Sequence, residues 1–369
     1  MSQTLESWGP ETHTSAVQQR RGPVHPFSIA PMMERTDRHF RALFRRISRN
    51  ALQYSEMVTT PALLHGDPQK HLQMATQEGP TALQLGGDSP EDLALCAKLG
   101  VEWGYAEINL NVGCPSSRVQ RGRIGACLMA DPGRVADCVQ AMREAVRVPI
   151  TVKHRIGIDE ADHYEDLVQF ASTVSQTHCD RFIIHARKAW LHGLSPKQNR
   201  TIPPLRYDLV HRLKRDYPHL TIEINGGITN LEECRYHLDH VDGVMVGRAA
   251  WNDPFGFVEV DRALYGETSV PPTRHEIIRG WLPHVEQERA RGTRLGWMVG
   301  GLYGMFRGCS GARAFRQAIA GAAGDPHAGA TEIEAALRLV PEDDGSNPRD
   351  VQPHSAVSSA PRQSFVIDS

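Results

Sequence analysis

Short apolar runs typical of β-strands alternate eight times with longer stretches of helical periodicity between Phe27 and Val246. Most of these runs are almost continuously apolar, as expected for parallel strands that are buried on both faces. Eight strand–helix repeats favour an α/β fold of the (β/α)8 TIM-barrel type, with a doubly wound parallel sheet as the alternative. The expected strands span 27–30, 55–59, 81–85, 106–110, 150–153, 182–185, 221–224 and 241–246.

Each expected strand is followed by polar residues or glycine. In a (β/α)8 barrel the carboxyl ends of all strands meet at one rim, where active sites lie. The sequence therefore predicts a single functional site built from these strand ends. They are Pro31-Met32-Met33, Thr59-Thr60, Gln84-Leu85-Gly86-Gly87, 109–114, Lys153-His154-Arg155, His185-Ala186-Arg187, Asn225-Gly226-Gly227 and Gly247-Arg248.

The pattern changes after Pro271-Pro272, beyond which helical spacing continues to about residue 339 without a strand candidate. We therefore expect a barrel over 26–270 and a small all-helical C-terminal domain over 273–340. The ends of the chain are polar and aperiodic, so we expect a flexible lead over 1–25 and a disordered tail over 341–369.

Composition limits the kind of protein this chain can be. No apolar run approaches the roughly 20 residues needed to cross a bilayer, and the first residues lack the pattern of an export signal. The seven cysteines are odd in number and none are spaced CxxC. This argues against a disulfide framework and against a structural zinc site. The sequence thus predicts a cytoplasmic protein with no membrane association, no bound metal and no evident stable protein partner.

The net charge is only −2, so a surface for nucleic acid requires a local cluster of basic residues. Such clusters occur over 35–49, 185–215 and 274–316, where Lys and Arg greatly outnumber Asp and Glu. A basic cluster is often only a solvated face, so these segments indicate RNA binding only together with other features.

Two glycine-rich strand ends predict a phosphate site. Asn225-Gly226-Gly227 and Gly247-Arg248 follow the seventh and eighth expected strands, where barrels commonly bind phosphate through backbone N–H groups. Either string alone is also typical of a tight turn. No GxGxxG follows the first strand, so a mononucleotide such as flavin mononucleotide (FMN) fits better than a dinucleotide.

Three further rim residues have chemistry suited to a flavin. Lys153 would place a cation beside the reduced flavin, and Gln84 both donates and accepts hydrogen bonds, as the flavin edge requires. His185 is expected to contact the flavin or the substrate. The alternative for Lys153 is a surface lysine paired with a carboxylate.

Cys114 lies between Gly113 and Pro115 in a loop expected to face the barrel mouth. A cysteine thiol in water is mostly protonated at neutral pH, so it is able to act as a general acid. Two alternatives remain open: a covalent role with His185 as base, and a buried, inert thiol. Cys127 has apolar neighbours that favour packing.

Ten collinear motifs over 27–316 resemble the tRNA-dihydrouridine synthases, and within them the branch that acts on D-loop positions 20 and 20a. The motifs are APM at Ala30, TDRHFR at Thr36, YSEMVTT at Tyr54, ALQLGG at Ala82, EINLNVGCPS at Glu107, GACLM at Gly125, RIGID at Arg155, FIIHARKAWLHGLSPKQNR at Phe182, INGGI at Ile224 and DGVMVGR at Asp242.

The resemblance implies that FMN, reduced by NADPH, passes hydride to uracil C6 while Cys114 protonates C5 from the opposite face. It implies FMN contacts from Pro31, Met32, Met33, Gln84, Lys153, His185, Asn225, Gly226, Gly227, Gly247 and Arg248. It implies tRNA contacts from Asn111, Lys197, Arg200, Arg313 and Arg316, with the last four expected to clamp the tRNA between the barrel and the helical domain. The uracil must leave its stack to enter the site, at a cost of a few kcal/mol.

The sequence departs from the branch at two places near the site. Met33-Glu34-Arg35 stands where Leu-Asp-Trp is typical, and His154 stands where Thr or Cys is usual. Two other functions remain as alternatives. One is an FMN barrel acting on a free pyrimidine, as in dihydroorotate dehydrogenases. The other is a non-catalytic RNA-binding module on the same scaffold.

Overall fold

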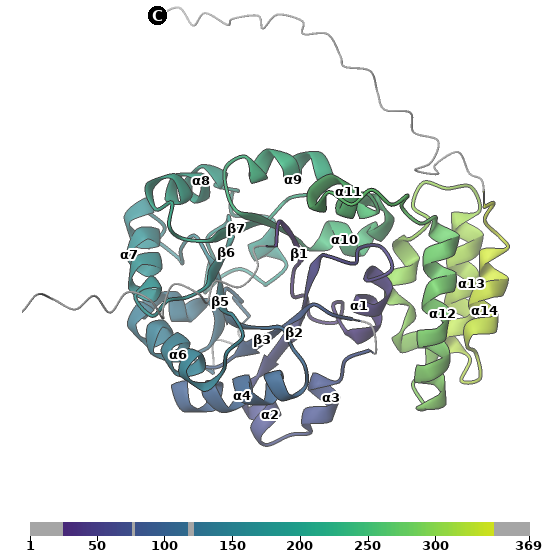
Figure 1. Cartoon of the computed structure of the whole chain (residues 1–369), viewed down its shortest axis with the longest axis horizontal. Helices are drawn as coiled ribbons and strands as arrows, with labels where there is room; N and C mark the ends of the chain where they lie inside the picture. Colours follow the sequence, from purple (N-terminus) through teal and green to yellow (C-terminus); the bar gives the residue numbers. More distant parts are fainter. Residues whose placement is uncertain (1–24, 76–77, 117–121, 343–369) are drawn as a thin grey trace, which may run out of the picture.

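The computed structural model describes residues 25–75, 78–116 and 122–342 of the 369-residue chain. The expected flexible lead and disordered tail lie outside the described residues, apart from residue 25 and residues 341–342. Eight parallel strands form a closed barrel in the order in which they occur along the chain, and the last strand pairs with the first. This confirms the (β/α)8 barrel and excludes the doubly wound sheet, whose edges do not join (Figure 1). The strands are β1 Phe27–Ile29, β2 Leu52–Thr59, β3 Thr81–Gly86, β4 Glu107–Val112, β5 Ile150–Arg155, β6 Arg181–His185, β7 Ile222–Asn225 and β8 Gly243–Val246.

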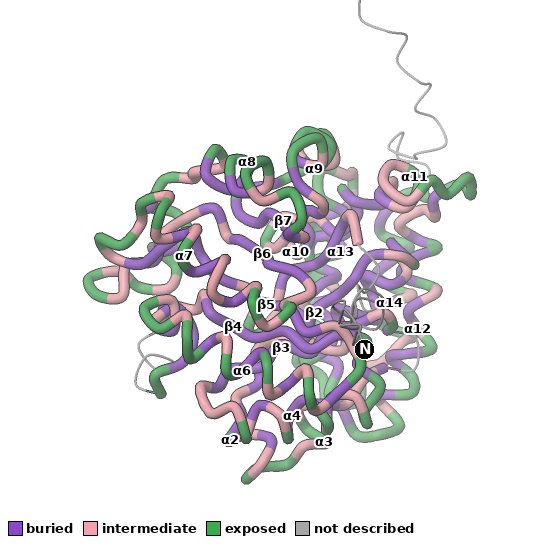
Figure 2. The backbone as a smooth tube through the Cα atoms, turned by 60° about the vertical axis from the view of Figure 1, so that its left-hand side comes forward, coloured by how far each residue is buried: buried purple, intermediate pink, exposed green. Residues whose placement is uncertain are grey.

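Helices cover the outside of the barrel, and Figure 2 shows the strands as buried backbone inside a layer that is exposed on its outer side. Several helices begin where the sequence provides a cap followed by proline, as at Ser89-Pro90 and Asp131-Pro132. The helices of the barrel are α1 Arg38–Phe44, α2 Thr60–Leu64, α3 Pro68–Leu72, α4 Pro90–Glu102, α6 Pro132–Ala145, α7 Tyr164–Ser175, α8 Tyr207–Asp216, α9 Leu231–Leu238, α10 Arg248–Asn252 and α11 Val260–Tyr265. Short 3-10 turns are η1 Gly125–Ala130, η2 Gln198–Arg200 and η3 Pro254–Phe257.

The inside of the barrel is more polar than the apolar strand sequences indicate. Alternate strand residues point inward, and they include Ser28, Gln84, Asn109, Thr151 and Glu223, all buried. Their neighbours in sequence point outward and pack with the helices in the main hydrophobic core. The strand ends also differ from expectation: β2 begins at Leu52 rather than at residue 55, and β4 continues to Val112.

A helical unit follows the barrel and packs against its side at α1 and α10 (Figure 1). Its first helix starts just after Pro271-Pro272 because Thr273 and Glu276 form a capping box. At the contact with the barrel, His39 Nδ1 and His284 Nε2 lie 2.9 Å apart, and the buried Trp281 donates its ring N–H to the His39 carbonyl. The unit consists of α12 Arg274–Ala290, η4 Leu295–Trp297, η5 Val299–Gly304, α13 Ala312–Gly324 and α14 Ala330–Leu337.

Across the described residues, the helices are all too short or too polar to span a lipid bilayer. Among the same residues, no three His, Cys, Asp or Glu side chains gather as a metal-ion site.

Candidate active site

The loop after β4 holds Cys114 in place through its backbone. The Asn111 side-chain oxygen accepts the N–H groups of Gly113 and Cys114, at 3.1 and 2.9 Å. On the other side, the Cys114 carbonyl accepts the N–H of Ala126 at 2.9 Å. The Arg155 Nε donates to the Gly113 carbonyl at 3.0 Å. Cys114 as a residue is half-buried, so the loop fixes its position near the surface of the mouth.

A hydrogen-bonded chain of side chains inside the barrel supports Asn111. Its amide nitrogen donates to Gln84 Oε1 at 2.8 Å, and Gln84 in turn donates to Asn109 at 2.8 Å. Asn109 donates to Thr151 at 2.9 Å. Asn111 and Gln84, predicted separately as tRNA and flavin contacts, are thus direct partners, and both are buried.

Lys153 points into the mouth from β5 and donates to Asn225 Oδ1 at 3.0 Å. Burial first, and then the positive charge of Arg155, lower the pKa of Lys153 to about 8. Lys153 is half-buried and forms no ion pair with a carboxylate of the described residues. It therefore differs from the surface lysine paired with a carboxylate that was the alternative. The Asn225 Nδ2 donates to the Met245 carbonyl at 2.8 Å, so Lys153 rests on a fixed acceptor.

The turn after β7 has a backbone conformation and surroundings that favour glycine. Gly226 and Gly227 have φ of +116° and +77°, values that L side chains rarely adopt. A Cβ on Gly226 would lie 2.5 Å from the His185 ring, and one on Gly227 would lie 2.8 Å from the Tyr207 hydroxyl. The Tyr207 hydroxyl donates to the Gly226 carbonyl at 2.6 Å, which fixes the orientation of that peptide.

The neighbouring strand ends close the same mouth. At Gly247 a Cβ would lie 3.5 Å from the Met32 sulfur, so the strand ends of β1 and β8 are adjacent there. Pro31 and Met32 are half-buried, whereas the Met33 side chain is 58% exposed. Arg248 is exposed and donates to the Arg200 carbonyl at 3.3 Å.

Positive charge is concentrated around His185. Burial lowers the pKa of His185 well below its ordinary value, followed by the charges of Arg155, Lys153, Arg187 and Arg248. The imidazole is therefore neutral near pH 7. Arg155 is the last residue of β5, and Arg187 lies two residues beyond the end of β6.

Of the five predicted tRNA contacts, the structure brings Asn111, Lys197 and Arg200 to the rim and leaves the other two elsewhere. Lys197 and Arg200 are exposed in the segment around η2. The fully buried Asn199 holds this segment through hydrogen bonds to Trp190 and Leu194. Arg313 and Arg316 are exposed on the first turns of α13, in the helical unit.

His154 points away from the mouth, and Cys127 lies in the 3-10 turn beside the Cys114 loop. His154 points outward from β5, because Lys153 beside it points inward, and its ring packs 4.7 Å from Phe170. Burial lowers the pKa of His154 to about 4, so this departure from the branch is a packing change in the helix layer. Cys127 lies in η1 with its thiol 3.2 Å from the Ile124 carbonyl, and burial raises its pKa.

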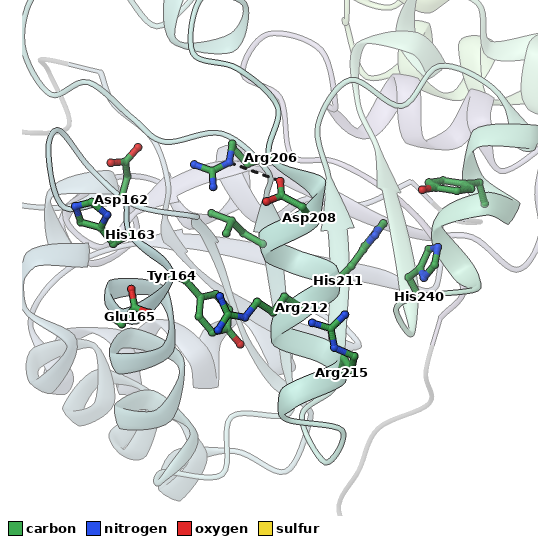
Figure 3. Close-up of a pocket in the computed structure, with 12 residues that line it drawn as sticks. Asp162, His163, Tyr164, Glu165, Arg206, Asp208, His211, Arg212, Arg215 and His240 are labelled. Carbon is green, nitrogen blue, oxygen red and sulfur yellow. Dashed lines mark ion pairs between the residues drawn. The ribbon is translucent and has the colours of Figure 1, made fainter. Parts of the chain in front are cut away.

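A groove of about 710 Å³ lies on the outer helices rather than at the mouth (Figure 3). Its cations have partners nearby: Arg206 pairs with Asp208 at 3.6 Å, and Arg212 lies over the Tyr164 ring at 3.7 Å. The groove therefore lacks the excess charge of the rim. Its lining residues are Asp162, His163, Tyr164, Glu165, Arg206, Asp208, Leu209, His211, Arg212, Arg215, Tyr236 and His240.

The closed barrel and a rim that combines a thiol, several cations and a glycine-lined turn define the class of protein. It is a (β/α)8-barrel enzyme with its site at the carboxyl ends of the strands.

Comparison with known proteins places the chain within that class. The sequence profile of dihydrouridine synthases matches residues 28–340. A protein from Synechocystis sp. is 54% identical over 315 residues, which cover 85% of this chain and 94% of that relative. One from Shewanella oneidensis is 54% identical over 317 residues, covering 86% and 94%. One from Escherichia coli K12 is 52% identical over 315 residues, covering 85% and 91%. All three are named tRNA-dihydrouridine(20/20a) synthase. The chain belongs to the dihydrouridine synthase family.

Proposed function

We propose that this protein reduces uridine in the D-loop of tRNA, at positions 20 and 20a, to 5,6-dihydrouridine, with bound FMN and with NADPH as the reductant. The observation that carries the proposal is the meeting of Cys114, Lys153 and the Gly226-Gly227 turn at one rim, in a chain that matches the family over 28–340. A reaction on cellular tRNA also places the protein in the cytoplasm.

The residues of the mouth fit a flavin with a single phosphate. Gly226 and Gly227 have positive φ values that favour glycine and give the turn a bare backbone, and Arg248 adds a guanidinium for the phosphate. We assign Lys153, Gln84, His185, Asn225 and the β1 end at Pro31, Met32 and Met33 to the remaining contacts. FMN, when bound, supplies hydride to uracil C6.

Cys114 supplies the proton in this proposal. The S–H bond breaks as a C–H bond forms at uracil C5, and the electron pair of the S–H bond stays on sulfur as thiolate. With the hydride at C6, the base gains two hydrogens across the former double bond. Lys153, Arg155 and Arg200 lie near Cys114, so the thiol faces cationic side chains, and solvent returns the proton to sulfur after the reaction.

The tRNA contacts that we propose are Asn111, Lys197 and Arg200 on the barrel and Arg313 and Arg316 on the helical unit. Asn111 already uses its amide within the protein, so its part is to position Cys114 at the same time as it faces the substrate. The cationic rim favours an anionic strand, and a uracil in a loop leaves its stack at a lower cost than one in a stem.

The decisive test is to map dihydrouridine by mass spectrometry in tRNA from cells that lack this protein. Restoring the wild-type gene should restore the modification at the D-loop positions. Restoring Cys114→Ala should leave the rate about 10²–10⁴-fold lower, since a general acid typically contributes that much.

Cys127→Ala is the matched control, because it removes a second half-buried cysteine, whose thiol donates to the Ile124 carbonyl instead of facing a substrate. It should restore the modification fully. Full restoration by Cys114→Ala would refute the role of this thiol. Absence of dihydrouridine with the wild-type protein, or turnover of free uracil with tRNA left unchanged, would refute the proposed substrate.

A further inference from the structure

The loop between β1 and α1 is held in an unusual backbone conformation. Glu34 has a φ of 61°, in the left-handed region that non-glycine residues rarely occupy. The Glu56 carboxylate on β2 accepts the backbone N–H groups of Glu34 and Arg35 and so holds this turn. Strained backbone of this kind persists where surrounding contacts impose it, and it is common at ligand sites.

The fixed turn places Arg35 over an aromatic ring. Its guanidinium carbon lies 5.7 Å from the centroid of Trp251, a residue of α10. Trp251 packs against Phe40, with ring centroids 5.0 Å apart. It also meets η5 of the helical unit, where a Cβ on Gly300 would lie 2.8 Å from the ring. Arg35 therefore lies where the rim of the barrel meets the helical unit.

Arg35 adds to a group of cations that have no counter-ion. Within the described ranges, Arg35, Arg200 and Arg248 form no ion pair with a carboxylate. The pKa of Arg200 is lowered by burial first, and then by the positive charges of Arg248 and Arg35. Like charges held this close are stabilised when an anion binds.

We propose that Arg35, supported on the Trp251 ring, binds a backbone phosphate of the tRNA strand that enters the rim. This inference rests on the proposed function. A guanidinium has the donor geometry to contact two phosphate oxygens, and stacking on an aromatic ring restricts its motion. The residue that departs from the typical Trp of the branch would thus provide a phosphate contact, with the aromatic surface supplied by Trp251.

The location favours RNA over the two other phosphates in the reaction. The FMN phosphate is matched by the glycine turn after β7 and by Arg248. Arg35 lies on the opposite side of β8 from that turn, beside the helical unit. A strand that contacts both the barrel rim and the helical unit at this side would lie beside Arg35. NADPH, which also carries phosphates, is distinguished by the experiment.

The test compares Arg35→Gln, Arg35→Lys and Arg147→Gln as purified, FMN-loaded proteins. Arg147 is an exposed arginine at the end of α6, on the opposite rim of the barrel. Arg35→Gln should weaken tRNA binding about tenfold and make its salt dependence shallower by about one unit of slope. Arg35→Lys should keep the slope but lose part of the affinity, because lysine lacks the planar fork. Arg147→Gln should match wild type.

The affinity for FMN and the KM for NADPH should be unchanged in all three variants. Unchanged tRNA affinity and salt slope in Arg35→Gln would overturn the inference. So would a loss confined to FMN binding or to the KM for NADPH, because the phosphate would then belong to a cofactor. Each of these results leaves the proposed function intact if wild type still forms dihydrouridine, whereas failure of wild type to do so refutes that function separately.

Discussion

Charged side chains are paired at one end of the barrel interior, whereas the cations at the other end have no carboxylate partner among the described residues. At the amino-terminal end, Arg181 is buried between two carboxylates, with Glu107 at 2.6 Å and Glu223 at 3.0 Å. Tyr54 donates to Glu107 at 2.7 Å, and Ser28 donates to Glu223. At the carboxyl-terminal rim, Lys153 and the arginines around it have no carboxylate partner among the described residues.

This difference shows how one scaffold separates stability from function. Buried charges that are paired and hydrogen-bonded are tolerated, and removing one partner is costly. The Arg181–Glu223 contact is an ion pair by distance, although its angle is poor for a hydrogen bond. Unpaired cations at the rim instead repel one another, and this repulsion destabilises the folded protein until an anion binds. No carboxylate of the described residues forms an ion pair with Lys153, Arg200 or Arg248, where phosphates are expected, although Glu34 and Glu56 lie beside Arg35.

The largest effect should come from breaking the paired end. Arg181→Met leaves Glu107 and Glu223 buried without their cation, so we expect a loss of about 3–5 kcal/mol in the free energy of unfolding. Denaturant unfolding measures this. Arg262→Met, which removes an exposed partner of Glu259, is the control and should cause a much smaller loss. Equal losses of unfolding free energy in the two variants would show that the buried amino-terminal network stabilises the fold no more than an exposed ion pair does.

The pH dependence of FMN binding tests the unpaired cations at the carboxyl-terminal rim. Lys153 has a pKa of about 8 because of burial and the charge of Arg155, and an anionic ligand favours its protonated form. FMN affinity should fall about tenfold between about pH 7 and about pH 9 as the apoprotein loses this proton. Lys153→Gln should bind more weakly at the lower pH and show little of this slope. A slope that persists in Lys153→Gln would assign the titration to another group.

The same lowered pKa has a consequence for stability. Between about pH 8 and the ordinary lysine value of about 10.4, the unfolded chain holds a proton at Lys153 that the folded apoprotein has lost. The free energy of unfolding of the apoprotein should therefore rise with pH across this window, relative to Lys153→Gln. A fall across the same window would contradict the assignment.

The smallest effect should come from the support of the glycine turn. Tyr207→Phe removes the 2.6 Å hydrogen bond to the Gly226 carbonyl and should weaken FMN binding about two- to tenfold. Fluorescence titration of the apoprotein measures the affinity. Tyr164→Phe removes a comparable bond to Asp216 on the outer helices and should leave FMN binding unchanged. Equal affinity in wild type and Tyr207→Phe would remove Tyr207 from the cofactor site.

The amino-acid sequence by itself determined the elements and their order. Apolar runs, proline-containing caps and the Thr273–Glu276 capping box are local signals, so they predict strands and helix starts without knowledge of the fold. Eight repeats then predicted the barrel, and the barrel predicted that Cys114, Lys153 and Gly226 share one rim. The outward position of His154 also follows from the inward position of Lys153, since side chains alternate along a strand.

Only the tertiary structure decided which charges meet. Arg181, Glu107 and Glu223 belong to three different strands, and their contact depends on the register with which the barrel closes. Arg35 meets Trp251 because the helix after β8 lies beside the loop after β1. Such contacts join residues that are remote in sequence, and no local pattern encodes the distance between them. The elements therefore follow from short-range preferences, while the division between a paired interior and an unpaired rim arises when the barrel closes.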